Sequence, residues 1–400
     1  ASVHATTAMG LRQSGACANP SGLVGSGVLW QEAVWQGVPV AGEPTRAAAA
    51  TGNPVVASAE ELQTAKDALL ANAPKVPVAQ TATNGHKAAA TLPKTSMPAQ
   101  PSETTVAGVP AVAIIGMGCR MPGAHSLDAF WSNITNGVSS ITTVPADRWD
   151  TDLYFDEDRD TPDKTYTKIG GFIKDFKFNS KRFRIPPKVA RQVDPVQQIT
   201  LESVADALED ANLKVDAKSD GRPFDRERCA VILGNSLGGE LKDDYSLRVG
   251  WPKFAKEIEQ TDAVQALDPT TRQLLMKQVE ERFKADLPEI NEDSMPGELS
   301  NVIAGRIANA FDLRGANFTV DAACASSMAA IQSAVKGLQD RDFDLVITGG
   351  ADRSMNAPTY VKFCKIGALS PDHSAPFDAS ANGFVMGEGC GILVLKRYEE

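Results

Sequence analysis

The segment Asn317–Ala330, with the sequence NFTVDAACASSMAA, gives the strongest local signal in the chain. It opens with four β-prone residues and continues with a run of small residues around Cys324. Apolar residues then recur at helical spacing: Met328, Ile331, Val335 and Leu338. This order predicts a strand over 317–320, a tight turn that holds the cysteine, and a helix over 326–338.

A cysteine in such a turn can act as a nucleophile. Its sulfur would face the unpaired N–H groups at the start of the helix, where the positive end of the helix dipole favours thiolate over thiol. The same N–H groups can stabilise the negative oxygen that forms when a thioester carbonyl is attacked. A buried structural role for Cys324 fits the position about equally well, because free cysteines are commonly buried.

The composition of the whole chain argues against several classes of protein. The 400 residues include 40 Lys+Arg and 50 Asp+Glu, a formal net charge of −10, which argues against a nucleic-acid-binding protein. The chain has neither an apolar run of roughly 20 residues nor a secretory leader, so we expect a cytoplasmic protein without a membrane span. The six cysteines are widely spaced and predict reduced thiols rather than a disulfide framework.

Composition also divides the chain. Residues 71–109 are rich in Ala, Pro and Thr and predict a largely disordered linker. The preceding segment, 1–70, stays unassigned; one short amphipathic stretch, Glu60–Ala71, lies at its end, and the segment would fit the tail of an upstream domain. Residues 110–400 are therefore expected to form the folded domain.

Strands alternate with helices in this domain, which indicates an α/β sheet. Further predicted strands are Ala111–Ile115, buried on both faces, Cys229–Leu233 and Asp344–Thr348. Predicted helices are Asp194–Ala211, one that begins at Asp268 in a charged insertion, and Leu299–Phe311. Asp194 is the expected N-cap of the first helix, with Gln197 completing a capping box. Two apolar runs, near Phe384 and at Gly391–Leu395, suggest a hairpin.

Five segments in this order resemble motifs of β-ketoacyl synthases, the cysteine-dependent condensing enzymes of fatty acid and polyketide synthesis. The sequence VDAACASS around Cys324 resembles their active-site motif. The others are Val112–Gly123, Phe130–Trp131 with Asp147–Trp149, Asp194–Glu202 and Pro376–Lys396. Within the family, Asp163–Phe176, the insertion over 251–293 and Ala325 after the cysteine are most similar to polyunsaturated fatty acid synthases and related iterative polyketide synthases.

The resemblance implies a thiolase-like fold with two similar halves in five α-β-α-β-α layers, usually as a homodimer. This chain would hold the N-terminal half and the start of the second. Cys324 would accept an acyl chain from an acyl carrier protein, and a carbanion made by decarboxylating malonyl carrier protein would then attack it. No bound cofactor or metal is implied, since the 4'-phosphopantetheine arm belongs to the carrier protein. Leu237, in GNSLGG, matches a position that lines the acyl tunnel, although a core leucine fits equally well.

The histidines depart from the family pattern. The resemblance implies two catalytic histidines in motifs like HGTGT and K-x-N-x-GH, and neither motif occurs here. The four histidines are His4, His86, His125 and His373. We therefore expect a chain truncated within its synthase domain, which keeps the nucleophile but does not condense by itself.

Alternatives from other functional classes are a non-catalytic partner like a chain-length factor, and a thiolase or cysteine hydrolase that uses coenzyme A or water. The presence of Cys324 favours an enzyme.

The motif Gly116-Met117-Gly118 is not a dinucleotide fingerprint, because Met121 replaces the third glycine. We expect Gly387, Glu388 and Gly389 to be structural. The remaining cysteines in apolar segments are expected to be packing residues: Cys119, Cys229, Cys364 and Cys390.

Overall fold

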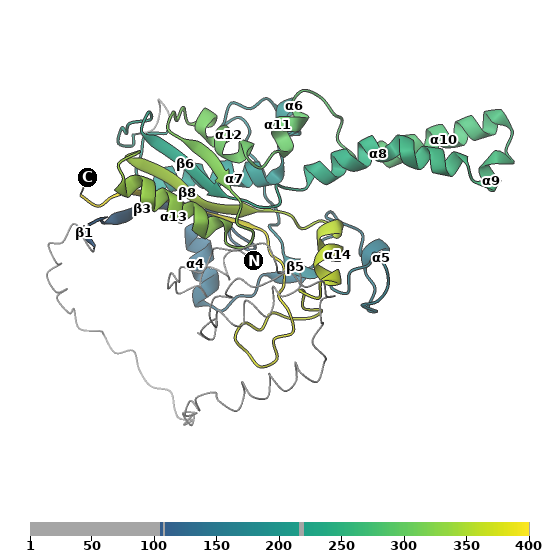
Figure 1. The fold of residues 1–400 in the computed structure, drawn as a ribbon, viewed down its shortest axis with the longest axis horizontal. Coiled ribbons are helices and arrows are strands. Elements are labelled where there is room, and N and C mark those ends of the chain that lie inside the picture. Colours follow the sequence, from purple (N-terminus) through teal and green to yellow (C-terminus); the bar gives the residue numbers. More distant parts are fainter. Residues whose placement is uncertain (1–104, 107–108, 216–219, 400) are drawn as a thin grey trace, which may run out of the picture. The chain divides into compact units, whose positions relative to one another are not determined.

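The computed structural model describes residues 105–106, 109–215 and 220–399 (Figure 1). The segment 1–70, its expected helix at Glu60–Ala71 and most of the expected linker over 71–109 lie outside these ranges. Where the description begins, β1 (Thr105–Val106) pairs antiparallel with β2 (Val109–Pro110).

A five-stranded sheet forms the centre of the domain, in the order β3-β9-β8-β6-β7. Its strands are β3 (Val112–Arg120), β6 (Cys229–Gly234), β7 (Asn317–Val320), β8 (Leu345–Asp352) and β9 (Gly389–Arg397). β6 runs parallel to β7 and β8, whereas β9 runs antiparallel to β8 and β3. The carboxyl ends of the three parallel strands therefore meet at one edge, where α/β sheets commonly place their sites.

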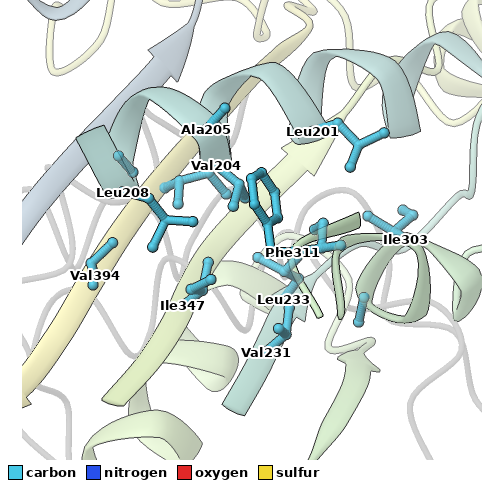
Figure 2. Close-up of a cluster of buried hydrophobic side chains, with 14 of the residues drawn as sticks. Leu201, Val204, Ala205, Leu208, Val231, Leu233, Ile303, Phe311, Ile347 and Val394 are labelled. Atoms are coloured by element: carbon cyan, nitrogen blue, oxygen red, sulfur yellow. The ribbon is translucent and has the colours of Figure 1, made fainter. Parts of the chain in front are cut away.

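Helices cover both faces of the sheet. On one face, α7 (Pro195–Asp210) and α12 (Val302–Ala310) enclose the larger hydrophobic core. Figure 2 shows Leu201, Val204 and Leu208 of α7 facing the side chains of β6, β8 and β9. On the other face, α13 (Ser326–Gln339) buries Ala330, Ala334 and Leu338. This α-β-α arrangement confirms the expected α/β class and the expected strand and helix around Cys324.

The start of α7 is only partly as predicted. Asp194 is the N-cap and accepts a hydrogen bond from Val196 N at 2.8 Å, and Pro195 takes the first helical position. The predicted capping box is wrong, because the Gln197 side chain forms hydrogen bonds with other residues and not with Asp194 N. Its Nε2 donates to Gly297 O at 2.8 Å, and its Oε1 accepts from Arg306 Nε at 2.5 Å. Gln197 thus joins α7 to the segment that precedes α12.

Strand β3 is longer than the predicted Ala111–Ile115 and is not buried on both faces. It is an edge strand, and Ile114 is 57% exposed. It continues through Gly116 and Gly118 because α7 lies against its backbone. A Cβ on Gly116 would lie 2.3 Å from Ala207 O, so glycine here permits close packing rather than ending the strand.

The insertion forms a helical hairpin that extends away from the sheet (Figure 1). It consists of α8 (Leu241–Glu259), α9 (Asp262–Gln265) and α10 (Pro269–Lys284). Helix α10 begins where predicted, with Asp268 as its N-cap. Helix α8 was missed because Gly250 and Pro252 interrupt its pattern. The ring of Trp251, 5.1 Å from that of Phe283 on α10, holds the two helices together.

The predicted hairpin near Phe384 is wrong. Phe384 makes only an isolated bridge with Leu369, and β9 pairs with β3 and β8 instead. The smaller elements are α4 (Leu127–Thr135), β4 (Ile141–Thr143), α5 (Thr151–Tyr154), β5 (Ile169–Gly171), α6 (Pro187–Ala190), α11 (Ser294–Glu298) and α14 (Ala357–Lys365). None of the helices in the described ranges combines the length and apolar character of a membrane span.

Candidate active site

Cys324 lies in the connection between β7 and α13. Its side chain is exposed, and it precedes the N-cap Ala325 and the first helical residue, Ser326. The buried structural position that the sequence allowed is therefore not the one observed. We call residues 321–326 the cysteine elbow.

The turn of the cysteine elbow is tight. Ala323 adopts φ +49°, a left-handed conformation that is unfavourable for a residue with a Cβ atom. Ala325 N donates to Ala322 O at 3.0 Å, and Ser326 N donates to Ala323 O at 3.1 Å. These bonds reverse the chain directly at the cysteine and start α13 on the far side of it.

Side chains on either side of Cys324 close the turn. Ser326 Oγ accepts from Ala322 N at 2.9 Å and donates to Ala323 O at 2.6 Å. Asp321 Oδ1 accepts from Ala323 N at 3.0 Å. In the sequence, Ser326 is only one of the small residues around Cys324, so its hydrogen bonds were not predicted.

Two glycines let the start of α13 approach the sheet. A Cβ on Gly234, at the end of β6, would lie 2.4 Å from Ser326 C and from Ser327 N. A Cβ on Gly350 of β8 would lie 2.7 Å from Ser327 Cβ. The first turn of α13 therefore rests directly on the backbones of two parallel strands, which fixes the height of the cysteine elbow above the sheet.

Leu237 lies in a loop beside the cysteine elbow and is 50% exposed, so it is not a core leucine. It lines a cavity of about 380 Å³ together with Thr319 and Asp321, which lead into the cysteine elbow. The other lining residues are Asn235, Ser236, Gly238, Lys242, Glu298, Leu299, Ser300 and Asn301. Cys324 is not among the lining residues, so the role of Leu237 in an acyl tunnel remains a prediction.

Asn235 joins the cavity to the sheet, a role that was not predicted. It is 3% exposed, and its Nδ2 donates to Ala351 O at 2.9 Å and to Gly238 O at 3.2 Å. Its Oδ1 accepts from Ser300 Oγ at 2.5 Å. The residue follows β6 in the GNSLGG stretch, and a polar residue at the carboxyl end of a buried strand is the signal that could have identified it.

Glu388 is structural, as expected, and belongs to a group that we call the buried ion cluster: Arg148, Glu240, Arg353 and Glu388. The Glu388 side chain is fully buried and accepts from Arg148 Nη2 at 2.7 Å and from Ile173 N at 2.6 Å. Arg148 also pairs with Glu240 at 2.8 Å. Burial raises the pKa of Glu240 above its usual value, although the nearby positive charge of Arg148 acts to lower it. Burial alone would lower the pKa of Arg148, but the two carboxylates raise it.

The other described cysteines differ sharply from Cys324. All four are buried: Cys119, Cys229, Cys364 and Cys390. Burial raises the pKa of Cys229 to about 12 and that of Cys119 and Cys390 to about 11, so these thiols stay protonated at neutral pH. Their burial agrees with the packing role expected from the sequence.

Neither described histidine is bonded to Cys324. His373 Nδ1 lies 2.7 Å from Asp372 Oδ1 in the loop after α14, and His125 is exposed before α4. His4 and His86 lie outside the described residues. Within the described ranges, the cysteine elbow therefore supplies an exposed nucleophile but no hydrogen-bonded base.

The proteins of known family that are similar to this chain match its folded domain. A family model described as the N-terminal domain of beta-ketoacyl synthases matches residues 110–400. One subunit of the polyunsaturated fatty acid synthase from Thraustochytrium sp. is 33% identical over 72% of this chain. One subunit of the phenolphthiocerol/phthiocerol polyketide synthase from Mycobacterium tuberculosis is 32% identical over 72% of the chain. The chain spans only 10% and 16% of these two relatives.

Solved structures give the same result. An oxazolomycin ketosynthase domain from Streptomyces albus is similar with a TM-score of 0.55 and 27% identity, over 72% of this chain and 42% of that one. The ketosynthase of module 6 of the bacillaene synthase from Bacillus subtilis is similar with a TM-score of 0.53 and 28% identity, over 72% and 40%. The expected thiolase-like fold is thus confirmed, and the chain belongs to the beta-ketoacyl synthase family.

Proposed function

We propose that this chain contributes the acyl-accepting half of a ketosynthase domain in a multidomain fatty acid or polyketide synthase. The observation that carries the proposal is the position of Cys324: it is exposed at the start of α13, whereas the other described cysteines are buried. Membership in the family supports the reaction class.

The first half-reaction uses residues of this chain. The Sγ of Cys324 attacks the carbonyl carbon of an acyl thioester, a carbon–sulfur bond forms, and the carrier thiol leaves with a proton. Main-chain N–H groups at the start of α13 stabilise the oxyanion during this step. The carrier supplies its own phosphopantetheine arm, so no other cofactor or metal is proposed.

The second half-reaction forms the carbon–carbon bond. Malonyl carrier protein loses carbon dioxide, and the resulting carbanion attacks the carbonyl of the acyl-cysteine, which releases the Cys324 thiolate. The family resemblance assigns two histidines to this step, and no described histidine is bonded to Cys324. We therefore propose that the 400-residue chain loads an acyl group but does not condense by itself.

Partners follow from this chemistry. We propose an acyl carrier protein domain as the donor, a homodimer as the working assembly and the cytoplasm as its location. Leu237 and the cavity beside it, about 380 Å³ in volume, would accommodate the acyl chain. Replacing Leu237 with Trp would then shorten the longest acyl chain that Cys324 accepts.

Mass spectrometry of the 400-residue chain tests the proposal. After incubation with hexanoyl carrier protein, we expect one hexanoyl group on Cys324 and none in a Cys324→Ser variant. With malonyl carrier protein added, we expect neither carbon dioxide release nor chain extension. Absence of the acyl-enzyme would contradict the acyltransferase proposal and favour a non-catalytic partner. Loading from hexanoyl coenzyme A but not from the carrier would favour a thiolase.

A further inference from the structure

Ser326 does more than begin α13. Its side chain bonds backward into the turn, to Ala322 N at 2.9 Å and Ala323 O at 2.6 Å, and not to the free N–H groups of its own helix. The N-cap of α13 is Ala325, which has no side chain that could cap the helix. The Ser326 hydroxyl therefore stabilises the turn around Cys324 rather than the helix that follows it.

From this bonding pattern we infer that Ser326 is a positioning residue for the Cys324 sulfur, an inference that rests on the proposed function. The two hydrogen bonds connect the residues before Cys324 with the residue two positions after it. They close a small ring of main chain that contains the cysteine. Because Cys324 lies inside that ring, the two hydrogen bonds restrict changes in the direction of its Cα–Cβ bond.

The turn needs such a clamp because one of its residues is strained. Ala323 has φ +49°, which costs free energy for any residue except glycine and persists only when its surroundings hold it. Its N–H donates to Asp321 Oδ1, and its carbonyl accepts from Ser326 Oγ at 2.6 Å and, over a longer distance of 3.1 Å, from Ser326 N. Without the Ser326 hydroxyl, Ala323 can relax toward negative φ and carry the neighbouring Cys324 with it.

Ser326 also connects the turn to the rigid part of the molecule. The residue is 5% exposed, and its main chain lies against Gly234 at the end of β6. The hydrogen bonds of Ser326 thus anchor the turn that holds Cys324 on the sheet. Removing the hydroxyl would take away both of its hydrogen bonds, the one from Ala322 N and the one to Ala323 O, which weakens the turn around Cys324.

The experiment compares Ser326→Ala with two other variants. Ser333→Ala is the matched control, because Ser333 lies on the same helix, is exposed, and donates to Ala329 O at 2.9 Å without touching the cysteine elbow. Ser326→Thr keeps the hydroxyl. The measurements are the rate of iodoacetamide labelling at Cys324 from pH 6 to 9, the kinetics of hexanoyl loading, and the melting curve of each variant.

We expect Ser326→Ala to slow labelling and to lower the maximal loading rate on the order of tenfold, because a displaced nucleophile misses its attack geometry. The KM for the thioester should stay near the wild-type value, since Ser326 does not touch the substrate. Ser326→Thr should recover most of the rate, and Ser333→Ala should match the wild type at every pH.

The inference is overturned if Ser326→Ala, shown by its melting curve to be folded at the assay temperature, labels and loads as fast as Ser333→Ala. It is also overturned if a slower Ser326→Ala is not rescued by Ser326→Thr while that variant melts normally. If wild-type Cys324 is alkylated but takes no hexanoyl group, the proposed function fails, and the labelling rates still decide the role of Ser326.

Discussion

The cysteine elbow and the buried ion cluster are polar regions of the same domain, built in opposite ways. The cysteine elbow is exposed, and short hydrogen bonds between main chain and side chains hold it. In the buried ion cluster, Glu388 is fully buried and the Arg148 side chain is 8% exposed, and the charges satisfy one another.

The exposed cysteine elbow is suited to reactivity, and the buried ion cluster to stability. A nucleophile must be reached by its substrate, so Cys324 stays in contact with solvent and is positioned by groups that do not compete for its sulfur. Buried charges must be paired, because an unpaired charge in a region without water is costly. We therefore expect changes in the cysteine elbow to alter the labelling and loading of Cys324, and changes in the buried ion cluster to alter the free energy of unfolding.

The largest expected effect is the contrast between Cys324 and the buried thiols. In the native protein at pH 7.5, iodoacetamide should label Cys324 on the order of 100-fold faster than Cys119, Cys229 or Cys390, because those thiols are buried and protonated. Peptide mapping by mass spectrometry gives the rate at each site. Equal rates in the native state would show that exposure does not distinguish the cysteine elbow, and labelling in denaturant provides the control.

The next effect lies in the buried ion cluster. Arg148→Met should lower the free energy of unfolding by about 3–5 kcal/mol, because it leaves Glu388 and Glu240 without their main positive partner. Arg314→Met is the control: Arg314 pairs with Glu227 at the surface, where solvent screens the pair, so its loss should change the stability little. Urea unfolding measures both variants. A loss in Arg148→Met no greater than in the control would contradict the structural role of the cluster.

Gly234→Ala tests the contact between the sheet and the cysteine elbow. A Cβ there would lie 2.4 Å from the main chain of Ser326, so we expect a destabilisation of about 1–3 kcal/mol and slower labelling of Cys324. Gly305→Ala on α12 is the control, since its Cβ would meet only Asn317 Oδ1 at 3.6 Å. If both variants behave alike in urea unfolding and labelling, the approach of α13 to β6 does not matter.

The smallest effect depends on pH. Burial, with Asp243 and Asp194 nearby, raises the pKa of Asp244 from 3.8 to about 6. A carboxyl whose pKa is raised in the folded state contributes stability below pH 3.8 and loses it as the pH rises through 6. Asp244→Asn should therefore be more stable than wild type at pH 7, by about 1 kcal/mol after allowance for solvent screening.

Thermal unfolding at pH 3.5 and pH 7 checks this prediction. The stabilisation should disappear at pH 3.5, where the wild-type carboxyl is also neutral. A stabilisation of equal size at both pH values would mean that the charge of Asp244 is not its cause. Asp262→Asn, in the same hairpin at the first position of α9, is the control and should show no comparable gain at pH 7.

Local pattern predicted much of the fold. The strand Asn317–Val320, the helix after Cys324 and the N-caps Asp194 and Asp268 follow from short-range sequence signals, and the structure contains them. The errors involve contacts between distant residues. Strand β3 continues through its glycines because α7 packs on it, and α8 continues through Gly250 and Pro252 because Trp251 packs on Phe283. No local periodicity encodes such partners.

The candidate site divides in the same way. Sequence pattern identified the residue that could be the nucleophile and predicted a strand, a turn and a helix around it, because these features depend on side chains and propensities within about a dozen residues. The packing of the layers settled that the sulfur is exposed and that Asn235 connects three segments. Burial and hydrogen bonding between distant segments arise when the layers pack, so they are properties of the folded chain.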